Sequence, residues 1–305
     1  MKLLFKFSIG LVLISSLLIG CKTAKLSTTT ETPAAVVKEQ NNASSLLWKI
    51  EGNGIKPSYL FGTVHILKQQ DFVLKQHVKD AFTEVEQIVL EVDMDDPNMQ
   101  MEMMQSAIMK DGVTLDQLID EKTYEALDAK LTKSLGIGVQ MFNTWQPMLL
   151  TSLLLTDIVG EQPASFEGTL VEMAKAQEKE VLGLETIAEQ LNFFHDIPYK
   201  EQATMILDYL NKAEEMEQSF SAMTGHYLSE NIDALYYYIM EESKKQNFNT
   251  ASLVDKRNEN WIPQIKAISS EKSSFFGVGA GHLGGTKGVV KLLKAAGFTV
   301  SPVVE

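Results

Sequence analysis

Two histidines stand in matching settings, each just past a short apolar run. The motif G-T-V-H ends at His65 after the run YLFGT, and the motif G-A-G-H ends at His282 after the run SFFGV. In open α/β sheets, ligands bind beyond the carboxyl ends of the strands, so both side chains are candidates for one site. Gly62, Gly279 and Gly281 would let the backbone turn tightly and approach a ligand or metal closely. The alternative is two turn histidines with no shared role.

Carboxylates fall at the same expected edge. Glu91 lies inside the apolar run QIVLEV, and Glu185 directly follows the run EVLGL. A carboxylate inside a buried strand is costly unless it is paired or bound to a metal. Two imidazoles with one or two carboxylates suit zinc, manganese, cobalt or iron. Such a divalent ion could lower the pKa of a bound water and polarise a carbonyl group.

Six short runs have the composition of strands that would position these side chains. They are apolar on both faces for most of their length, as strands buried between helix layers are. The runs are Leu46–Ile50, Tyr59–Thr63, Gln87–Val92, Glu180–Leu184, Ser274–Val278 and Phe298–Val303.

Helical patterns lie between the expected strands. The spacing of apolar residues predicts a helix over Asp71–Val85 and another over Gly284–Ala296, which Gly297 would end. Residues 97–177 and 186–269 carry only helical signals. Alternation of strands and helices argues for an α/β fold. We therefore predict a mixed central sheet built from both chain ends, with a large helical insertion in the middle.

The beginning of the chain has the pattern of an exported lipoprotein. Lys2 and Lys6 precede an apolar stretch that is too short for an ordinary spanning helix. The sequence L-I-G-C ending at Cys21 resembles a bacterial lipobox, in which the cysteine is lipidated. We predict a signal peptide at 1–20 and a lipid-anchored Cys21.

A flexible tether at 21–45, rich in Thr, Ala, Asn and Ser, would follow the lipidated cysteine, and one domain would fill 46–305. Lys22 follows the cysteine where aspartate would signal retention in the inner membrane. The expected location is therefore the cell envelope, with the outer membrane favoured.

Composition restricts the chemistry and the partners. Removing the two lysines of the signal takes the formal charge from −13 to −15, which disfavours nucleic acid and anionic lipid head groups. Cys21 is the only cysteine, so the domain has no thiol nucleophile and no cysteine-ligated zinc. Histidine and carboxylate must carry the chemistry.

Several motifs together resemble the TraB/GumN family, which Tiki-type metalloproteases also resemble. They follow one another between Leu46 and Val300 as LLWKIEG, PSYLFGTVHI, QIVLEVD, VLGLET with EQL, KRNENW and FFGVGAGHLGGTKGVVKLLKAAGFTV. The last is the most specific, being long and glycine-patterned. The resemblance implies an α/β hydrolytic scaffold in which both G-x-x-H motifs and an acidic residue meet at one metal-dependent site.

Carried over by position, His65, Glu91 and His282 fall on the family's most characteristic polar residues and are the expected metal ligands. Glu185 falls on the glutamate of the GLET motif, and Arg257 on the arginine of an E-R-N motif. These two are the expected catalytic residues, as general base and oxyanion stabiliser. The chain departs from the pattern at two further positions, with Lys256 in place of the motif's glutamate and Glu167 in place of an aspartate.

The resemblance favours a membrane-anchored, metal-dependent hydrolase, with exported peptides or proteins as substrates. The alternative is a lipoprotein that binds a metal, haem or peptide in the same pocket without turning it over, as haem-binding lipoproteins of similar fold do. Convergence of the two histidines and a carboxylate on one point would support either version.

Overall fold

A computed structural model describes residues 45–160, 163–195, 197–245 and 250–305. The expected signal peptide, Cys21 and the tether as far as residue 44 lie outside the described residues. The folded part begins no later than Ser45, which is buried and donates its hydroxyl to the carbonyl oxygen of Val303, 2.7 Å away. Within the described ranges, no helix combines the length and the apolar character needed to cross a membrane.

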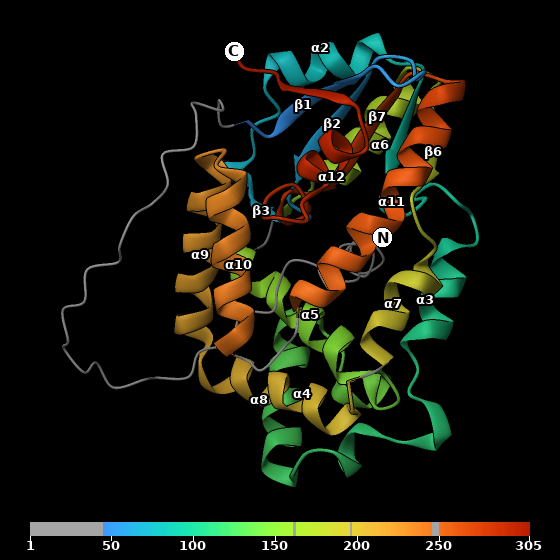
Figure 1. Ribbon diagram of the computed structural model, residues 1–305. Coiled ribbons are helices and arrows are strands. Elements are labelled where there is room, and N and C mark those ends of the chain that lie inside the picture. The colour runs from blue at the N-terminus through green and yellow to red at the C-terminus, as the bar shows by residue number, and fades with distance from the viewer. Residues whose placement is uncertain (1–44, 161–162, 196, 246–249) are drawn as a thin grey trace, which may run out of the picture.

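Six strands form one mixed sheet in the order β6-β4-β7-β2-β1-β8 (Figure 1). Strands β6, β4, β7 and β2 run parallel, and β1 runs antiparallel to both of its neighbours. All six expected strands are therefore confirmed, as is a sheet built from both chain ends, but β4 ends at Leu90 and not at Val92, so Glu91 lies just after the strand and not within it. The strands are β1 (Leu47–Glu51), β2 (Ser58–Thr63), β4 (Gln87–Leu90), β6 (Glu180–Gly183), β7 (Ser274–Gly279) and β8 (Thr299–Pro302).

A second, two-stranded sheet was not expected. Strands β3 (Leu67–Lys68) and β5 (Pro163–Ala164) pair antiparallel. The prediction that 97–177 contains only helices was wrong at β5. Two residues are too few to produce a period-two pattern, so only tertiary pairing identifies this strand.

The sheet separates two layers of helices. Alternate side chains of a strand point to opposite faces, so Phe61 of β2 packs on one side and Leu60 on the other. Helices α2 (Gln76–Glu84) and α6 (Phe166–Ala176) cover the Phe61 face, whereas α11 (Thr250–Glu271) and α12 (Val289–Ala295) cover the Leu60 face. This arrangement explains why the strands are apolar on both sides.

The remaining helices gather beyond one end of the sheet (Figure 1). Helix α5 packs against α8, α9 against α10, and α3 against α7, while α10 contacts the turn that follows β7. The α/β class with a helical region between the sheet strands is thus confirmed. These helices are α3 (Met99–Ala107), α4 (Glu121–Leu135), α5 (Pro147–Val159), α7 (Ile187–His195), α8 (Tyr199–Asn211), α9 (Ala213–Leu228) and α10 (Ile232–Lys245).

Two helices begin later than predicted. The residues before Gln76 do not join α2; there Phe72 places its ring centroid 4.6 Å from that of Phe166. Helix α12 begins at Val289 because Gly288 directly before it is extended, with a ψ of 147°, and Gly285 has a φ of +81°; a right-handed helix accommodates neither. The predicted stop at Gly297 is confirmed by its φ of +91°.

Candidate functional site

The carboxyl ends of four adjacent parallel strands bring four polar side chains together. Glu185 follows β6, Glu91 follows β4, His282 follows β7 and His65 follows β2. The backbone N–H of Glu185 donates to the carbonyl oxygen of Glu91 at 2.9 Å, which fixes these two residues side by side. The side chains of all four are at most 8% exposed.

Gly279 lies at the point on which these side chains converge. A Cβ placed on it would lie 3.2 Å from Oε1 of Glu91, 3.6 Å from Cδ2 of His282 and 3.8 Å from Nε2 of His65. The backbone N–H of Gly279 donates to the same Oε1 at 2.7 Å. The missing side chain therefore leaves a small space bordered by two imidazoles and a carboxylate.

Arg257 on α11 reaches into this cluster and contacts three of its members. Nη2 lies 2.5 Å from Oε2 of Glu91 and 2.5 Å from Oε1 of Glu185, while Nε donates to both oxygens of Glu185 at 3.1 and 3.2 Å. Nη1 lies 3.1 Å from Nε2 of His282. The buried guanidinium of Arg257 is therefore shared by two carboxylates. The side-chain amide of Gln190 donates a further hydrogen bond of 3.1 Å to each of these carboxylates.

The protonation of His282 follows from its partners. A guanidinium can only donate hydrogen bonds, so Nε2 of His282 is the acceptor from Arg257 and Nδ1 carries the proton. Nδ1 donates to Oδ1 of Asn258 at 2.6 Å, and the ring stacks at 4.6 Å on Trp261. Burial lowers the pKa of His282 to about 3, with Arg257 acting in the same direction. His282 is therefore neutral.

His65 is oriented by a carboxylate on the opposite side. Its Nδ1 lies 2.8 Å from Oε1 of Glu167, which also accepts the hydroxyl of Thr63 at 2.5 Å. Burial opposes the charged form of His65, but Glu167 outweighs it and raises the pKa of the imidazole. His65 in turn holds the pKa of Glu167 below its ordinary value, against the effect of burial. The two form a buried, oriented dyad.

The two carboxylates held by Arg257 differ in their electrostatics. Burial would raise the pKa of Glu91, but Arg257, His282 and His65 together hold it below its ordinary value. For Glu185, burial outweighs Arg257 and raises the pKa. The surroundings therefore favour the ionised form of Glu91, whereas burial favours the protonated form of Glu185.

The expected ligands are of the kinds that bind a divalent metal. Metal-bound histidines usually donate their second ring nitrogen to a carboxylate or carbonyl, and Glu167 and Asn258 stand in that relation to His65 and His282. Yet in the described part of the chain no three His, Cys, Asp or Glu side chains are already arranged to hold a metal. Arg257 occupies the acceptor nitrogen of His282 and bonds Glu91 instead.

Sequence reasoning missed four residues of this site as participants. Asn258 and Glu167 lie at motif positions, and Gln190 and Trp261 lie inside the EQL and KRNENW segments, but none of the four was predicted to contact the site. The partners of Glu167 and Asn258 come from distant segments, which no local pattern identifies.

The other two glycines expected at this edge are explained by close packing. Gly62, Gly279 and Gly281 all have a φ outside the positive region, so none is needed for a left-handed turn. A Cβ on Gly62 would lie 3.0 Å from the Cβ of Ala280, and one on Gly281 would lie 2.9 Å from Cδ1 of Ile239. Strand β2 and helix α10 can approach the turn after β7 because these side chains are missing.

A cavity of about 300 Å³ opens beside Glu185, between α7 and α11. This volume is at the lower end of the range of small-molecule sites. Of the four side chains at the strand ends, Glu185 is the one that lines it. A ligand in this cavity therefore meets Glu185 first, with Arg257 directly behind it.

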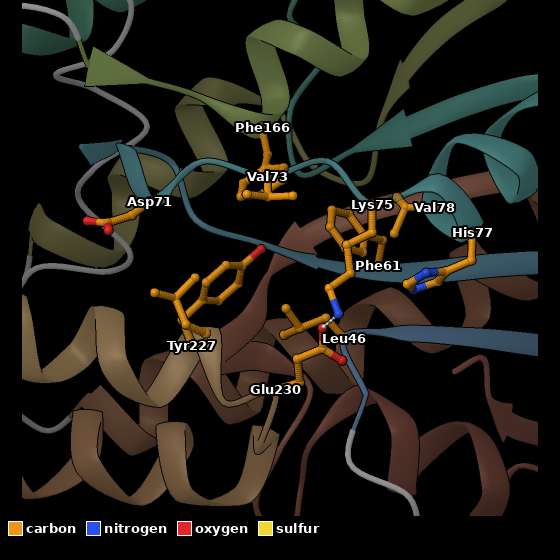
Figure 2. A pocket seen from close by; sticks show the side chains of 11 residues that line it. Leu46, Phe61, Asp71, Val73, Lys75, His77, Val78, Phe166, Tyr227 and Glu230 are labelled. Atoms are coloured by element: carbon orange, nitrogen blue, oxygen red, sulfur yellow. Dashed lines mark ion pairs between the residues drawn. The ribbon is translucent and has the colours of Figure 1, made fainter. Parts of the chain in front are cut away.

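A second cavity is lined by residues of β2, α2, α6 and α9 (Figure 2). It is lined by apolar side chains that include Phe61, Phe166 and Tyr227, and an ion pair of 2.9 Å joins Lys75 to Glu230 at its rim. Its volume of about 60 Å³ is far below that of a substrate site. The cavity beside Glu185 is therefore the candidate route to the strand ends.

Comparison with known proteins gives a family match over nearly all of the folded part. The model of the TraB/PrgY/gumN family matches residues 46–302. Similar curated proteins include Metalloprotease TIKI1 of Danio rerio, 23% identical over 320 residues (86% of this chain, 63% of the relative). Metalloprotease TIKI1 of Homo sapiens is 23% identical over 322 residues (86% and 62%). The chain thus spans about three-fifths of the length of these relatives. No solved structure matches the chain.

Proposed function

The chain belongs to the TraB/PrgY/gumN family, and from this premise we propose that it is a hydrolase of peptide bonds in exported peptides or proteins. The observation that carries the proposal is the meeting of His65, Glu91, Glu185 and His282 with Arg257 at the carboxyl edge of the sheet. Two oriented imidazoles, two carboxylates and a fixed cation are the groups that peptide hydrolysis needs. The relatives named metalloproteases support the same substrate class.

A divalent metal is the cofactor that we propose, with His65, His282 and Glu91 as its ligands and zinc, manganese, cobalt or iron as candidates. When bound, such an ion supplies a Lewis acid that polarises a carbonyl and acidifies water. Because Nε2 of His282 has one lone pair, it accepts from Arg257 or binds a metal, but not both at once. Loading therefore requires Nη1 of Arg257 to withdraw from His282.

Glu185 is the proposed general base. It lines the cavity beside α7 and α11, so a water molecule next to a bound substrate can reach it. The pKa of Glu185 is raised by burial, which brings a carboxylate closer to the range that suits proton transfer near neutral pH. Arg257, whose guanidinium lies 4.9 Å from the centre of the Trp261 ring, is the cation proposed to stabilise the developing oxyanion once Nη1 has withdrawn from His282.

The proposal is tested by metal analysis and hydrolysis assays on the same purified full chain in detergent. We expect about one divalent metal per chain, hydrolysis of members of a peptide library, loss of hydrolysis with a chelator and recovery with added metal. Hydrolysis that persists after complete metal removal would overturn the metal. Stoichiometric metal, haem or peptide binding without any hydrolysis would favour the non-catalytic binding lipoprotein instead.

A methyl group at the convergence point should disturb the site without unfolding the protein. We expect Gly279→Ala to lower kcat/KM by about 100-fold, since its Cβ would press on the carboxylate of Glu91 and small misplacements at active sites have effects of this size. The matched control is Gly225→Ala on α9, where a Cβ meets nothing within 4 Å. That variant should keep its activity and gain up to about 1 kcal/mol of stability. Equal activity of the two variants would contradict the convergence point.

We also propose that lipid on Cys21 anchors the chain to a membrane of the cell envelope, the outer membrane where the cell has one. The lipobox-like L-I-G-C sequence and the apolar stretch before it support this location. Metabolic labelling with palmitate should mark the wild type and leave Cys21→Ser unlabelled. Equal labelling of both would refute the anchor.

A further inference from the structure

Helix α11 presents two adjacent rows of side chains to two different places. Lys256, Asn260 and Gln264 recur at every fourth position and line the 300 Å³ cavity. Arg257 and Trp261 follow one position later; Trp261 also borders the cavity, whereas Arg257 reaches the strand ends through Glu91, Glu185 and His282. Residues four apart lie on one face of a helix. The same helix therefore joins a row of one cation and two amides to the candidate catalytic groups.

The acidic side chains of the cavity are already engaged. Glu185 is paired with Arg257. Glu189 accepts the N–H of Thr186 at 2.8 Å and its hydroxyl at 3.0 Å. These contacts occupy the carboxylate of Glu185 and the Oε2 oxygen of Glu189.

Lys256 differs from these acids. It is exposed, lines the cavity, and forms no ion pair with any residue in the described part of the chain. Lys287, which precedes α12, is instead paired with Glu259 of α11 at 2.9 Å. The cation of this cavity is therefore available to a ligand.

We propose that this cavity is a substrate subsite for a carboxylate, with Lys256 as the specificity-determining residue. The inference rests on the proposed hydrolase function and names its substrate class: peptides that carry a carboxylate close to the scissile bond. Asn260 and Gln264 supply amide groups for the peptide main chain, and Asn192 faces them from α7. The carboxylate belongs either to an acidic side chain or to the peptide's C-terminus.

The two sources are separated with matched peptides. Peptides cleaved by the wild type are compared in pairs that differ by glutamate or glutamine at one position, and in pairs that end in a free acid or an amide. The variants are Lys256→Met and Lys256→Glu in the full chain. Lys266→Met is the control, since Lys266 is an exposed lysine of α11 that does not line the cavity.

In the wild type and in Lys266→Met, kcat/KM should be roughly threefold to tenfold higher for the carboxylate member of one kind of pair. The difference should lie mainly in KM. It is modest because an ion pair at a partly exposed site contributes little binding free energy. In Lys256→Met the ratio should fall to about one, and in Lys256→Glu below one. An unchanged ratio in Lys256→Met overturns the inference.

Direct binding measurements distinguish failure of the proposed hydrolase function from failure of the proposed subsite. If the wild type cleaves no peptide, calorimetric titration of the same pairs decides the matter. Tighter binding of the carboxylate member that is lost in Lys256→Met upholds the subsite and refutes only the hydrolase. Equal binding of both members by the wild type overturns the subsite.

Discussion

Replacing Arg257 with methionine should lower the free energy of unfolding by about 3–5 kcal/mol, because it leaves two buried carboxylates without their cation. Glu91 and Glu185 have side chains only 4% and 8% exposed, and both bond Nη2 of Arg257 at 2.5 Å. Urea unfolding followed by circular dichroism measures the loss.

Two comparisons make the Arg257 prediction specific. Lys266→Met removes an exposed cation from the same helix and should change stability by no more than about 0.5 kcal/mol. Adding Glu91→Gln and Glu185→Gln to Arg257→Met removes the orphaned charges, so the triple variant should recover part of the loss. A change below about 1 kcal/mol in Arg257→Met would mean that the carboxylates are not held as described.

Replacing His65 with alanine should lower kcat/KM by at least about 100-fold and reduce the metal content. Substituting a residue that only hydrogen-bonds a metal ligand already costs about 10–100-fold in metal affinity or activity, and His65 is a proposed ligand itself. His65 lies between Glu167, which orients Nδ1 at 2.8 Å, and the convergence point at Gly279, which Nε2 faces. Metal analysis and hydrolysis of the same preparation measure both effects.

The control for His65→Ala is His226→Ala. His226 lies on α9 and stacks on Tyr238 at 4.9 Å, away from the strand ends. This variant should keep its metal and its activity. Full hydrolysis by His65→Ala with unchanged metal content would sink the assignment of His65 as a ligand.

A substitution of Glu167, the carboxylate that orients His65, should have a weaker effect than a substitution of His65 itself. Glu167→Gln keeps the shape of the side chain but removes the charge that raises the pKa of His65. The glutamine keeps one side-chain oxygen, which can still accept hydrogen bonds from Thr63 and His65. The loss of kcat/KM in Glu167→Gln should therefore be smaller than the loss in His65→Ala.

How much of the fold could be predicted depended on the length of each element. The six long strands of the sheet were recognisable because apolar runs such as QIVL in β4 are buried on both faces. Strands β3 and β5, with two residues each, were not. The first turn expected before Gln76 failed because Phe72 packs on Phe166 outside the helix, a contact between segments 94 positions apart in the sequence.

The sequence by itself determined which side chains lie at the carboxyl edge of the sheet. His65, Glu185 and His282 follow apolar runs and Glu91 lies near the end of a fourth run, and parallel strands end at one edge of a sheet. That edge was therefore predictable from position along the chain alone.

Only the tertiary structure decided how these side chains are partnered. Arg257 is 166 positions from Glu91, and Glu167 is 104 positions from Thr63. Local patterns report on a strand or a helical turn, whereas the cation between two glutamates and the carboxylate behind a histidine depend on how whole layers pack. The same packing aligned Lys256 with the cavity beside Glu185, because the rotation of α11 on the sheet sets which of its rows faces that cavity.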